Sequence, residues 1–219
     1  MYTLLKPLQV RETLLNKGVH TFTANDFETI FRVSGPKVKY FLETQTQEGL
    51  LLRLKKGTYA LKTDLPSELE IANRLYRPSY VSFEYALAYW GIVPEMPYVI
   101  TSATTKPTRQ FIVNGKGFMY FTIKLEAYTG YQLINVSLSN LGKRDNYYLS
   151  ESINNDTSRC LLAEPEKALV DYLYFVSLGK KQLSDRLYIR AGSLNKTKLK
   201  VYAAMYNRKK LSQLIKDYL

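Results

Sequence analysis

The amino-acid sequence predicts an α+β protein with two domains that divide at residue 65. Apolar residues recur at helical spacing between residues 4 and 44 and then follow an extended pattern over residues 50–61. Further extended segments lie between residues 98 and 138, and helical spacing returns after residue 163. The length of 219 residues also exceeds that of a typical single domain, which favours two.

Two helices are predicted at the start of the chain. The first contains the apolar positions from Leu4 to Leu15 and ends at Asn16-Lys17-Gly18. The second has Thr23 as its N-cap, with Asp26 three residues later as the partner in a capping box. We expect this second helix to end at Ser34-Gly35.

A third helix is predicted from Ser34, its N-cap, to about Gln47. Pro36 lies near its first turn, where the missing backbone N–H has no helical partner to lose. The expected buried stripe consists of Val38, Phe41 and Leu42. The outward side chains are then Lys37, Lys39, Tyr40, Glu43 and Thr44.

Two short strands are predicted next, over residues 50–54 and 58–61. The segment Lys55-Lys56-Gly57 joins them and supplies a glycine turn with two ammonium groups at its tip. Three helices followed by a basic hairpin is the element order of a winged helix-turn-helix. The sequence therefore predicts a winged helix-turn-helix over residues 1–65.

This arrangement predicts a DNA-binding surface. The second limb of a helix-turn-helix can lie in the major groove, and lysines on the hairpin can neutralise phosphates. The alternative is that the module mediates only protein contacts. The candidate DNA-binding residues are Lys37, Lys39, Tyr40, Thr44, Arg53, Lys55 and Lys56.

Residues 66–219 are expected to form a larger α+β domain with a mainly antiparallel sheet and C-terminal helices. Helices are predicted over residues 68–75 and 82–90, and Gly91 is suited to end the second of these in the left-handed conformation. The predicted strands cover residues 98–103, 108–113, 118–126 and 131–138, with a tight turn at Asn114-Gly115. A helix packed on the sheet begins near Pro165, and two or three amphipathic helices follow after residue 180.

The charge of the chain is strongly positive, which favours a polyanionic partner. The formal net charge is +12, from 31 Lys and Arg against 19 Asp and Glu. Residues 161–219 carry 12 basic and five acidic residues, so the excess is greatest at the C-terminal end. This tail could touch nucleic acid or an acidic protein, or carry only a solvated face. Its candidate interaction surface consists of Lys196, Lys198, Lys200, Arg208, Lys209 and Lys210.

The sequence favours neither an enzyme nor a metal or cofactor site. It has one cysteine, Cys160, and one histidine, His20, which are too few soft ligands for a zinc site. The carboxylates of Glu164, Glu166 and Asp171 lie near a helix start, where capping and compensation of the helix dipole explain them better than a metal does. A metal-dependent nuclease remains an alternative.

No apolar run approaches the roughly 20 residues that cross a bilayer, and the N-terminus lacks the apolar core of a signal peptide. We therefore expect a soluble, cytoplasmic protein with no membrane partner.

Three stretches of the chain resemble the AbiEi family, the antitoxins of type IV (AbiE-type) toxin-antitoxin systems, which act in phage defence by abortive infection. They follow one another in the order of the family over nearly the whole chain. The stretches are Arg53–Tyr59, then Tyr80-Val81-Ser82 with Ala86-Leu87 and Trp90-Gly91, and finally Ala163–Asp171.

The resemblance implies a DNA-binding antitoxin and no catalytic residue. The N-terminal winged helix would bind inverted repeats at the chain's own promoter and repress the operon, and residues 66–219 would form an antitoxin domain. That domain would oppose a nucleotidyltransferase-like toxin, with or without a stable complex. Inverted repeats favour the binding of two copies of the chain to one DNA site, even if the chain is a monomer in solution. The alternative is a protein-interaction module that docks an acidic partner.

Overall fold

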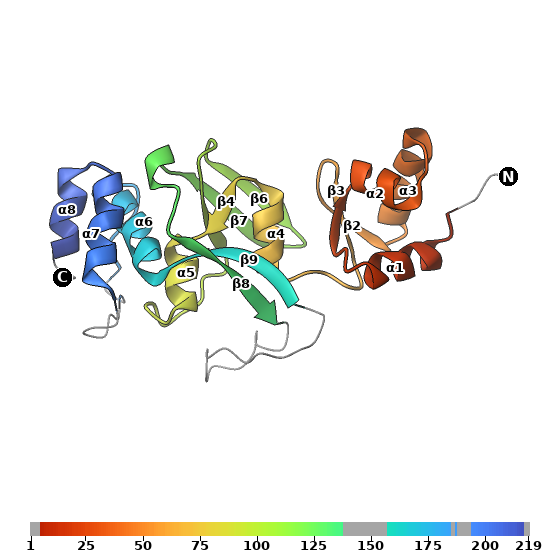
Figure 1. Cartoon of the computed structure of the whole chain (residues 1–219). Helices are drawn as coiled ribbons and strands as arrows, with labels where there is room; N and C mark the ends of the chain where they lie inside the picture. The colour runs from red at the N-terminus through yellow and green to blue at the C-terminus, as the bar shows by residue number, and fades with distance from the viewer. Residues whose placement is uncertain (1–4, 138–156, 185–186, 188–193, 217–219) are drawn as a thin grey trace. The chain divides into compact units, whose positions relative to one another are not determined.

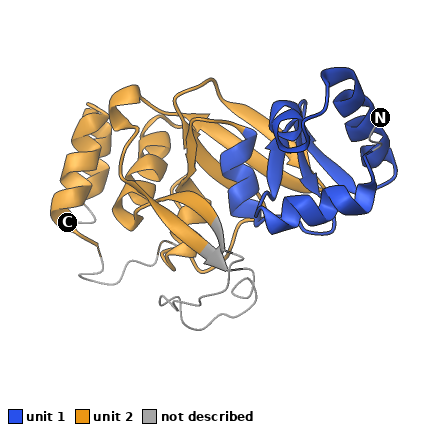
Figure 2. Cartoon of the chain, turned by 45° about the vertical axis from the view of Figure 1, so that its right-hand side comes forward, with its two compact units in different colours: residues 1–75, 137–158 blue, residues 76–136, 159–219 orange. Residues whose placement is uncertain are grey.

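The computed structural model describes residues 5–137, 157–184, 187 and 194–216. The chain is a mixed α+β protein that separates into two compact units (Figures 1 and 2). Unit 1 contains the described residues up to Leu75 together with Ser137, Thr157 and Ser158, and the described residues from Tyr76 to Val136 and from Arg159 onward belong to unit 2.

The described part of unit 1 consists of four helices and a small sheet. In chain order its elements are α1 (Pro7–Asn16), β1 (Thr21–Thr23), α2 (Ala24–Phe31), α3 (Gly35–Gln47), β2 (Leu51–Lys55), β3 (Thr58–Leu61) and α4 (Glu68–Leu75). The predicted helices and the predicted hairpin are thus present, whereas the short strand β1 was not predicted. A strand of three residues is too brief to establish an alternating pattern.

The ends of α2 follow from local side-chain chemistry. The Asp26 N–H donates to Thr23 Oγ1 at 3.2 Å, and the Thr23 N–H donates to Asp26 Oδ2 at 2.8 Å, which forms the predicted capping box. At the other end, Arg32 adopts the left-handed conformation with φ 52°. The helix therefore ends at Phe31, before the expected stop at Ser34-Gly35.

The sheet of unit 1 is antiparallel with the strand order β1-β3-β2. Gly57 turns the chain between β2 and β3 with φ 76°, a conformation that favours glycine. The turn is one residue shorter than predicted because Lys55 pairs with Thr58 as the last residue of β2.

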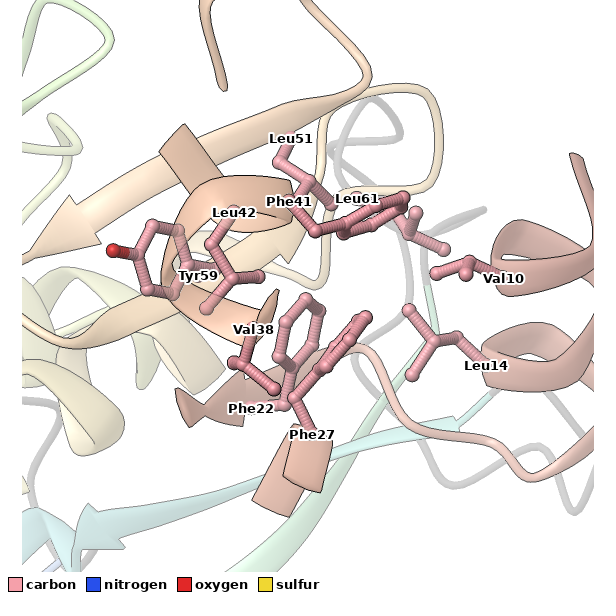
Figure 3. Packing of buried hydrophobic residues seen from close by; sticks show 10 residues of the cluster. All are labelled: Val10, Leu14, Phe22, Phe27, Val38, Phe41, Leu42, Leu51, Tyr59 and Leu61. Atoms are coloured by element: carbon pink, nitrogen blue, oxygen red, sulfur yellow. The ribbon is translucent and has the colours of Figure 1, made fainter. Parts of the chain in front are cut away.

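An apolar cluster joins the elements of unit 1 from α1 to β3, as Figure 3 shows. Val10 and Leu14 of α1 reach it from one side, and Val38, Phe41 and Leu42 of α3 reach it from another. The remaining buried members are Phe22, Phe27, Leu51, Tyr59 and Leu61. The predicted stripe of α3 is therefore its core face.

Helix α4 belongs to unit 1, although its residues follow the domain boundary that the sequence suggests at residue 65. Arg74 Nε donates to Thr21 Oγ1 of β1 at 2.7 Å, and Lys55 Nζ of β2 donates to the Leu75 carbonyl at 2.7 Å. These bonds attach both sheet edges to the end of α4, so the compact units divide after Leu75.

Unit 2 contains a six-stranded sheet and four α-helices within its described part. Its strands are β4 (Ser79–Val81), β5 (Ile100–Thr104), β6 (Arg109–Val113), β7 (Lys116–Thr122), β8 (Tyr131–Ser137) and β9 (Thr157–Ala163). Its helices are α5 (Phe83–Tyr89), the 3-10 helix η1 (Leu125–Ala127), α6 (Pro165–Ser177), α7 (Lys196–Met205) and α8 (Lys209–Lys216).

The strand order in this sheet is β6-β7-β5-β4-β9-β8. Antiparallel pairs predominate when the two sheets are taken together. Within this larger sheet, for which the sequence predicts a mainly antiparallel arrangement, β4 with β5 and β6 with β7 are antiparallel, whereas β4 with β9 and β5 with β7 pair in parallel. Asn114-Gly115 forms the predicted turn between β6 and β7, with φ 48° and 80°. The central strands β4 and β9 were not predicted.

Helix α6 is the centre of the helical layer of unit 2, in contact with α5, α7 and α8. Aromatic rings connect it to the sheet: Phe175 of α6 lies 5.3 Å from both Phe83 of α5 and Phe121 of β7, between ring centroids. The prediction that this helix packs on the sheet is confirmed. In the part of the chain that the structure describes, no helix has the length and apolar character needed to cross a membrane.

Candidate nucleic-acid interface

Helix α3 presents the predicted cationic face. Pro36 lies in its first turn, and Val38, Phe41, Leu42 and Gln45 turn its other face to the core. On the outward side, the side chains of Lys37, Lys39 and Tyr40 are exposed, and Tyr40 retains 73% of its accessible surface. A phenol ring this exposed contributes little to the core and is available for contact with a ligand.

Thr44 and Glu43 complete the outward part of α3. Glu43 is exposed, whereas Thr44 is half-buried one turn after Tyr40. The face therefore combines cations, one aromatic ring and one carboxylate. Such a mixture can accept and donate hydrogen bonds at base edges as well as bind phosphates.

The hairpin of β2 and β3 adds further cations, and α3 packs against β2. Arg53 on β2 and Lys56 at the turn are exposed. Lys55 is half-buried, and its ammonium donates to the Leu75 carbonyl at 2.7 Å. Because a lysine near the last carbonyls of a helix stabilises that helix end, Lys55 has a structural role in joining β2 to α4.

The basic residues of the tail divide into two groups. Lys196, Lys200, Lys209 and Lys210 are exposed on α7 and α8. Lys198 is exposed as well, but its Nζ donates to Glu164 Oε2 at 2.8 Å, and Arg208 donates to the side chain and the carbonyl of Ser177, both at 2.8 Å. Lys198 and Arg208 therefore fasten α7 and α8 to the two ends of α6.

Unit 2 also contains a buried polar cluster around Asp171, which sequence reasoning missed. Tyr80 Oη and Ser82 Oγ donate to Asp171 Oδ2 at 2.9 and 2.8 Å, and Tyr206 Oη donates to Asp171 Oδ1 at 2.5 Å. Lys167 forms an ion pair with the same carboxylate from one helical turn earlier. We call Tyr80, Ser82, Lys167, Asp171 and Tyr206 the Asp171 cluster.

The Asp171 cluster is closed to solvent. The side chains of Lys167 and Asp171 have no exposed surface, and Tyr80 and Tyr206 are also fully buried. Burial lowers the pKa of Lys167, although the Asp171 carboxylate acts against this shift. Burial also raises the pKa of Tyr80 and of Tyr206, and the charge of Asp171 adds to it. The cluster therefore joins β4, α6 and the end of α7 as a structural core.

The carboxylates that could suggest a metal site have other partners. Glu164 accepts from Lys198 and from Tyr202 Oη, both at 2.8 Å, and Glu166 accepts from the Asn195 N–H at 2.8 Å. Asp171 is surrounded by the donors of its own cluster. Among the described residues, no group of three or more His, Cys, Asp or Glu side chains could hold a metal ion.

Cys160 is buried on β9 and forms no disulfide, whereas His20 is half-buried just before β1. Neither residue contributes to the cationic face of α3 and the hairpin.

No protein-family model matches this chain, and no curated protein matches it either.

Proposed function

We propose that this chain is a sequence-specific DNA-binding protein with a winged helix-turn-helix in unit 1. Helix α3 would enter the major groove, and the hairpin of β2 and β3 would contact the DNA backbone as the wing. The observation that carries this proposal is the outward face of α3, where Lys37, Lys39 and Tyr40 are exposed, next to a hairpin with Arg53 and Lys56.

The arrangement of unit 1 supports the proposal. Helices α2 and α3 are joined by a short connection, and both cover the cluster in which Phe27 and Phe41 stack with ring centroids 5.4 Å apart. Strand β1 pairs with β3 as far as Thr58, next to the turn, so the hairpin of β2 and β3 is part of a three-stranded sheet. The core contacts hold the inner face of α3, and its outer face with Lys37, Lys39 and Tyr40 is exposed to solvent.

The DNA-binding proposal predicts that Lys56→Ala weakens binding to every duplex alike. Lys56 at the turn would contact phosphate, so the variant should bind roughly fivefold more weakly near 0.15 M salt and lose about one unit of the salt slope. Fluorescence anisotropy with labelled DNA from the chain's own upstream region measures both quantities across a salt series.

Lys17→Ala is the matched control, because Lys17 is also exposed but lies at the end of α1. It should leave the affinity nearly unchanged. If the wild-type chain bound no duplex at low salt, or bound its upstream region no better than a scrambled duplex, the proposed function would be wrong.

We further propose that the protein is the cytoplasmic antitoxin of a type IV pair. This part rests on the resemblance of Arg53–Tyr59, of the motifs from Tyr80 to Gly91 and of Ala163–Asp171 to the AbiEi family. In this proposal unit 1 represses the operon, and unit 2 opposes a nucleotidyltransferase-like toxin. The exposed lysines of α7 and α8 offer a surface for an acidic partner.

Co-expression tests the antitoxin part separately from DNA binding. Expression of a nucleotidyltransferase-like product of the neighbouring gene should stop growth, and co-expression of this chain from an unrelated promoter should restore it. The Lys56→Ala variant should restore growth as well as the wild type while repressing a promoter reporter less. Failure of the wild type to restore growth would contradict the antitoxin role and leave the DNA-binding proposal standing.

A further inference from the structure

The burial pattern of α3 fixes which of its side chains points straight away from the core. The buried residues Val38, Phe41, Leu42 and Gln45 define the inner side of the helix. Successive residues are separated by about 100° around a helix axis. The average direction of the four buried residues therefore gives the centre of the inner side. Tyr40 and Glu43 both lie within roughly 30° of the opposite point, at the centre of the outer side.

Lys37 and Lys39 occupy different positions. By the same geometry they are roughly 160° apart, one on each flank of the outer side. Their exposed ammonium groups therefore lie to either side of a central strip that contains Tyr40 and Glu43. The sequence alone grouped Lys37, Lys39 and Tyr40 together as candidate DNA-binding residues, whereas the helix geometry separates the two lysines from Tyr40.

We infer that Tyr40 and Glu43 read base edges and determine sequence specificity, while Lys37 and Lys39 bind phosphates on the two walls of the major groove. This inference rests on the proposed DNA-binding function. A helix that lies in the groove directs the centre of its outer side at the base pairs and its flanks at the two backbones. Long, flexible ammonium side chains suit the flanks because phosphates attract them without strict geometry.

The carboxylate of Glu43 restricts the base that it can face. An ionised carboxylate only accepts hydrogen bonds, so it needs an exocyclic amine as its partner. Cytosine presents its N4 amine in the major groove, whereas guanine presents only acceptors there, and adenine places the acceptor N7 beside its amine. The site therefore fits a duplex with cytosine opposite Glu43, and the exposed ring of Tyr40 fits the methyl group of a nearby thymine.

The same carboxylate also opposes non-specific binding. Phosphates repel it at every duplex, and only a correctly placed cytosine amine compensates for this repulsion. Removal of the charge should therefore have two effects of opposite sign, which are an increase in affinity for random DNA and a decrease in discrimination. A residue with a merely structural role would not produce this combination.

Selection of binding sites from a random duplex pool, followed by affinity measurements, tests the inference on the full chain. The wild type should select a motif with at least one strongly preferred cytosine. Glu43→Gln should lose about tenfold of the discrimination at that position, with a shift toward adenine, because an amide can pair with adenine N6 and N7. Tyr40→Ala should weaken the preference at a neighbouring thymine.

Glu12→Gln is the matched control, since Glu12 is an exposed carboxylate on α1. It should select the same motif as the wild type, and the secondary structure of all variants is compared by circular dichroism. If Glu43→Gln and Glu12→Gln selected the same motif with equal discrimination, or if Lys37→Ala alone altered the preferred base, the inference would be overturned. A wild type that bound DNA without any preferred motif would instead refute the proposed function itself.

Discussion

Asp171→Ala should lower the free energy of unfolding by about 3–5 kcal/mol, the usual effect when one partner of a buried ion pair is removed. The variant would leave the Lys167 ammonium without a counter-charge at a site with no solvent exposure. It would also remove the acceptor of Tyr80, Ser82 and Tyr206, whose hydroxyls donate to Asp171 at 2.5 to 2.9 Å. Each such unsatisfied buried group adds a cost of its own.

Denaturant unfolding followed by tryptophan fluorescence measures this effect within unit 2. Trp90 is the single tryptophan of the chain, and its indole N–H donates to the Ala163 carbonyl at 2.8 Å, just before α6. Its emission therefore reports on the region that the Asp171 cluster holds together. A midpoint for Asp171→Ala equal to that of the wild type would show that the cluster does not stabilise unit 2.

Two further variants separate charge from packing. Glu126→Ala removes an exposed carboxylate of the same unit and should change stability by less than about 0.5 kcal/mol. The double variant Lys167→Met with Asp171→Leu removes both charges and should recover a large part of the loss, because an apolar pair of similar volume avoids the desolvation cost. A double variant as unstable as Asp171→Ala would point to the tyrosine hydrogen bonds as the main contribution.

Local signals explain why most of unit 1 could be predicted from the sequence. The capping box of Thr23 and Asp26, the proline of α3 and the glycine turn of the hairpin each act within a few residues. The burial of Val38, Phe41 and Leu42 likewise follows from helical spacing alone. The outward face of α3 was predictable for the same reason, since exposure is the complement of that stripe.

The Asp171 cluster could not be predicted, because it depends on contacts between distant segments. Tyr80 and Asp171 are 91 residues apart, and Tyr206 lies 35 residues beyond Asp171. From the sequence alone, Asp171 looked like a carboxylate that compensates a helix dipole. A signal was present, however: apolar residues surround Lys167 and Asp171 on every side of α6, so this i,i+4 pair could only be internal.

Lys55 shows a second limit of local reasoning. A lysine beside a glycine turn predicts a cation at the tip of a wing, and the sequence does not reveal that its ammonium reaches the end of α4. The same bond helps to explain why α4 joins unit 1, whereas the sequence divides the domains at residue 65. Strands β4 and β9 escaped prediction because β4 has three residues and β9 contains polar ones.

Phe27→Ala should destabilise unit 1 by about 3–5 kcal/mol, the typical cost of removing a buried phenylalanine ring from a core. Phe27 has no exposed surface, and its ring lies 5.7 Å from Phe22, 4.4 Å from Phe31 and 5.4 Å from Phe41, between centroids. It therefore connects β1, α2 and α3, and its loss would release the support of α3, the helix that we propose binds DNA.

Amide hydrogen exchange measures this loss where it occurs, because Trp90 reports on unit 2 rather than on unit 1. Exchange in α2 and α3 should accelerate strongly in Phe27→Ala, and DNA affinity should fall as the folded fraction of unit 1 declines. Phe31→Ala is the control. Because Phe31 is only half-buried, this substitution should lower the stability of unit 1 clearly less than Phe27→Ala does. Unchanged protection of α3 in Phe27→Ala would mean that the helix holds its position without this ring. The aromatic cluster would then not be the support of the outward face with Tyr40 and Glu43.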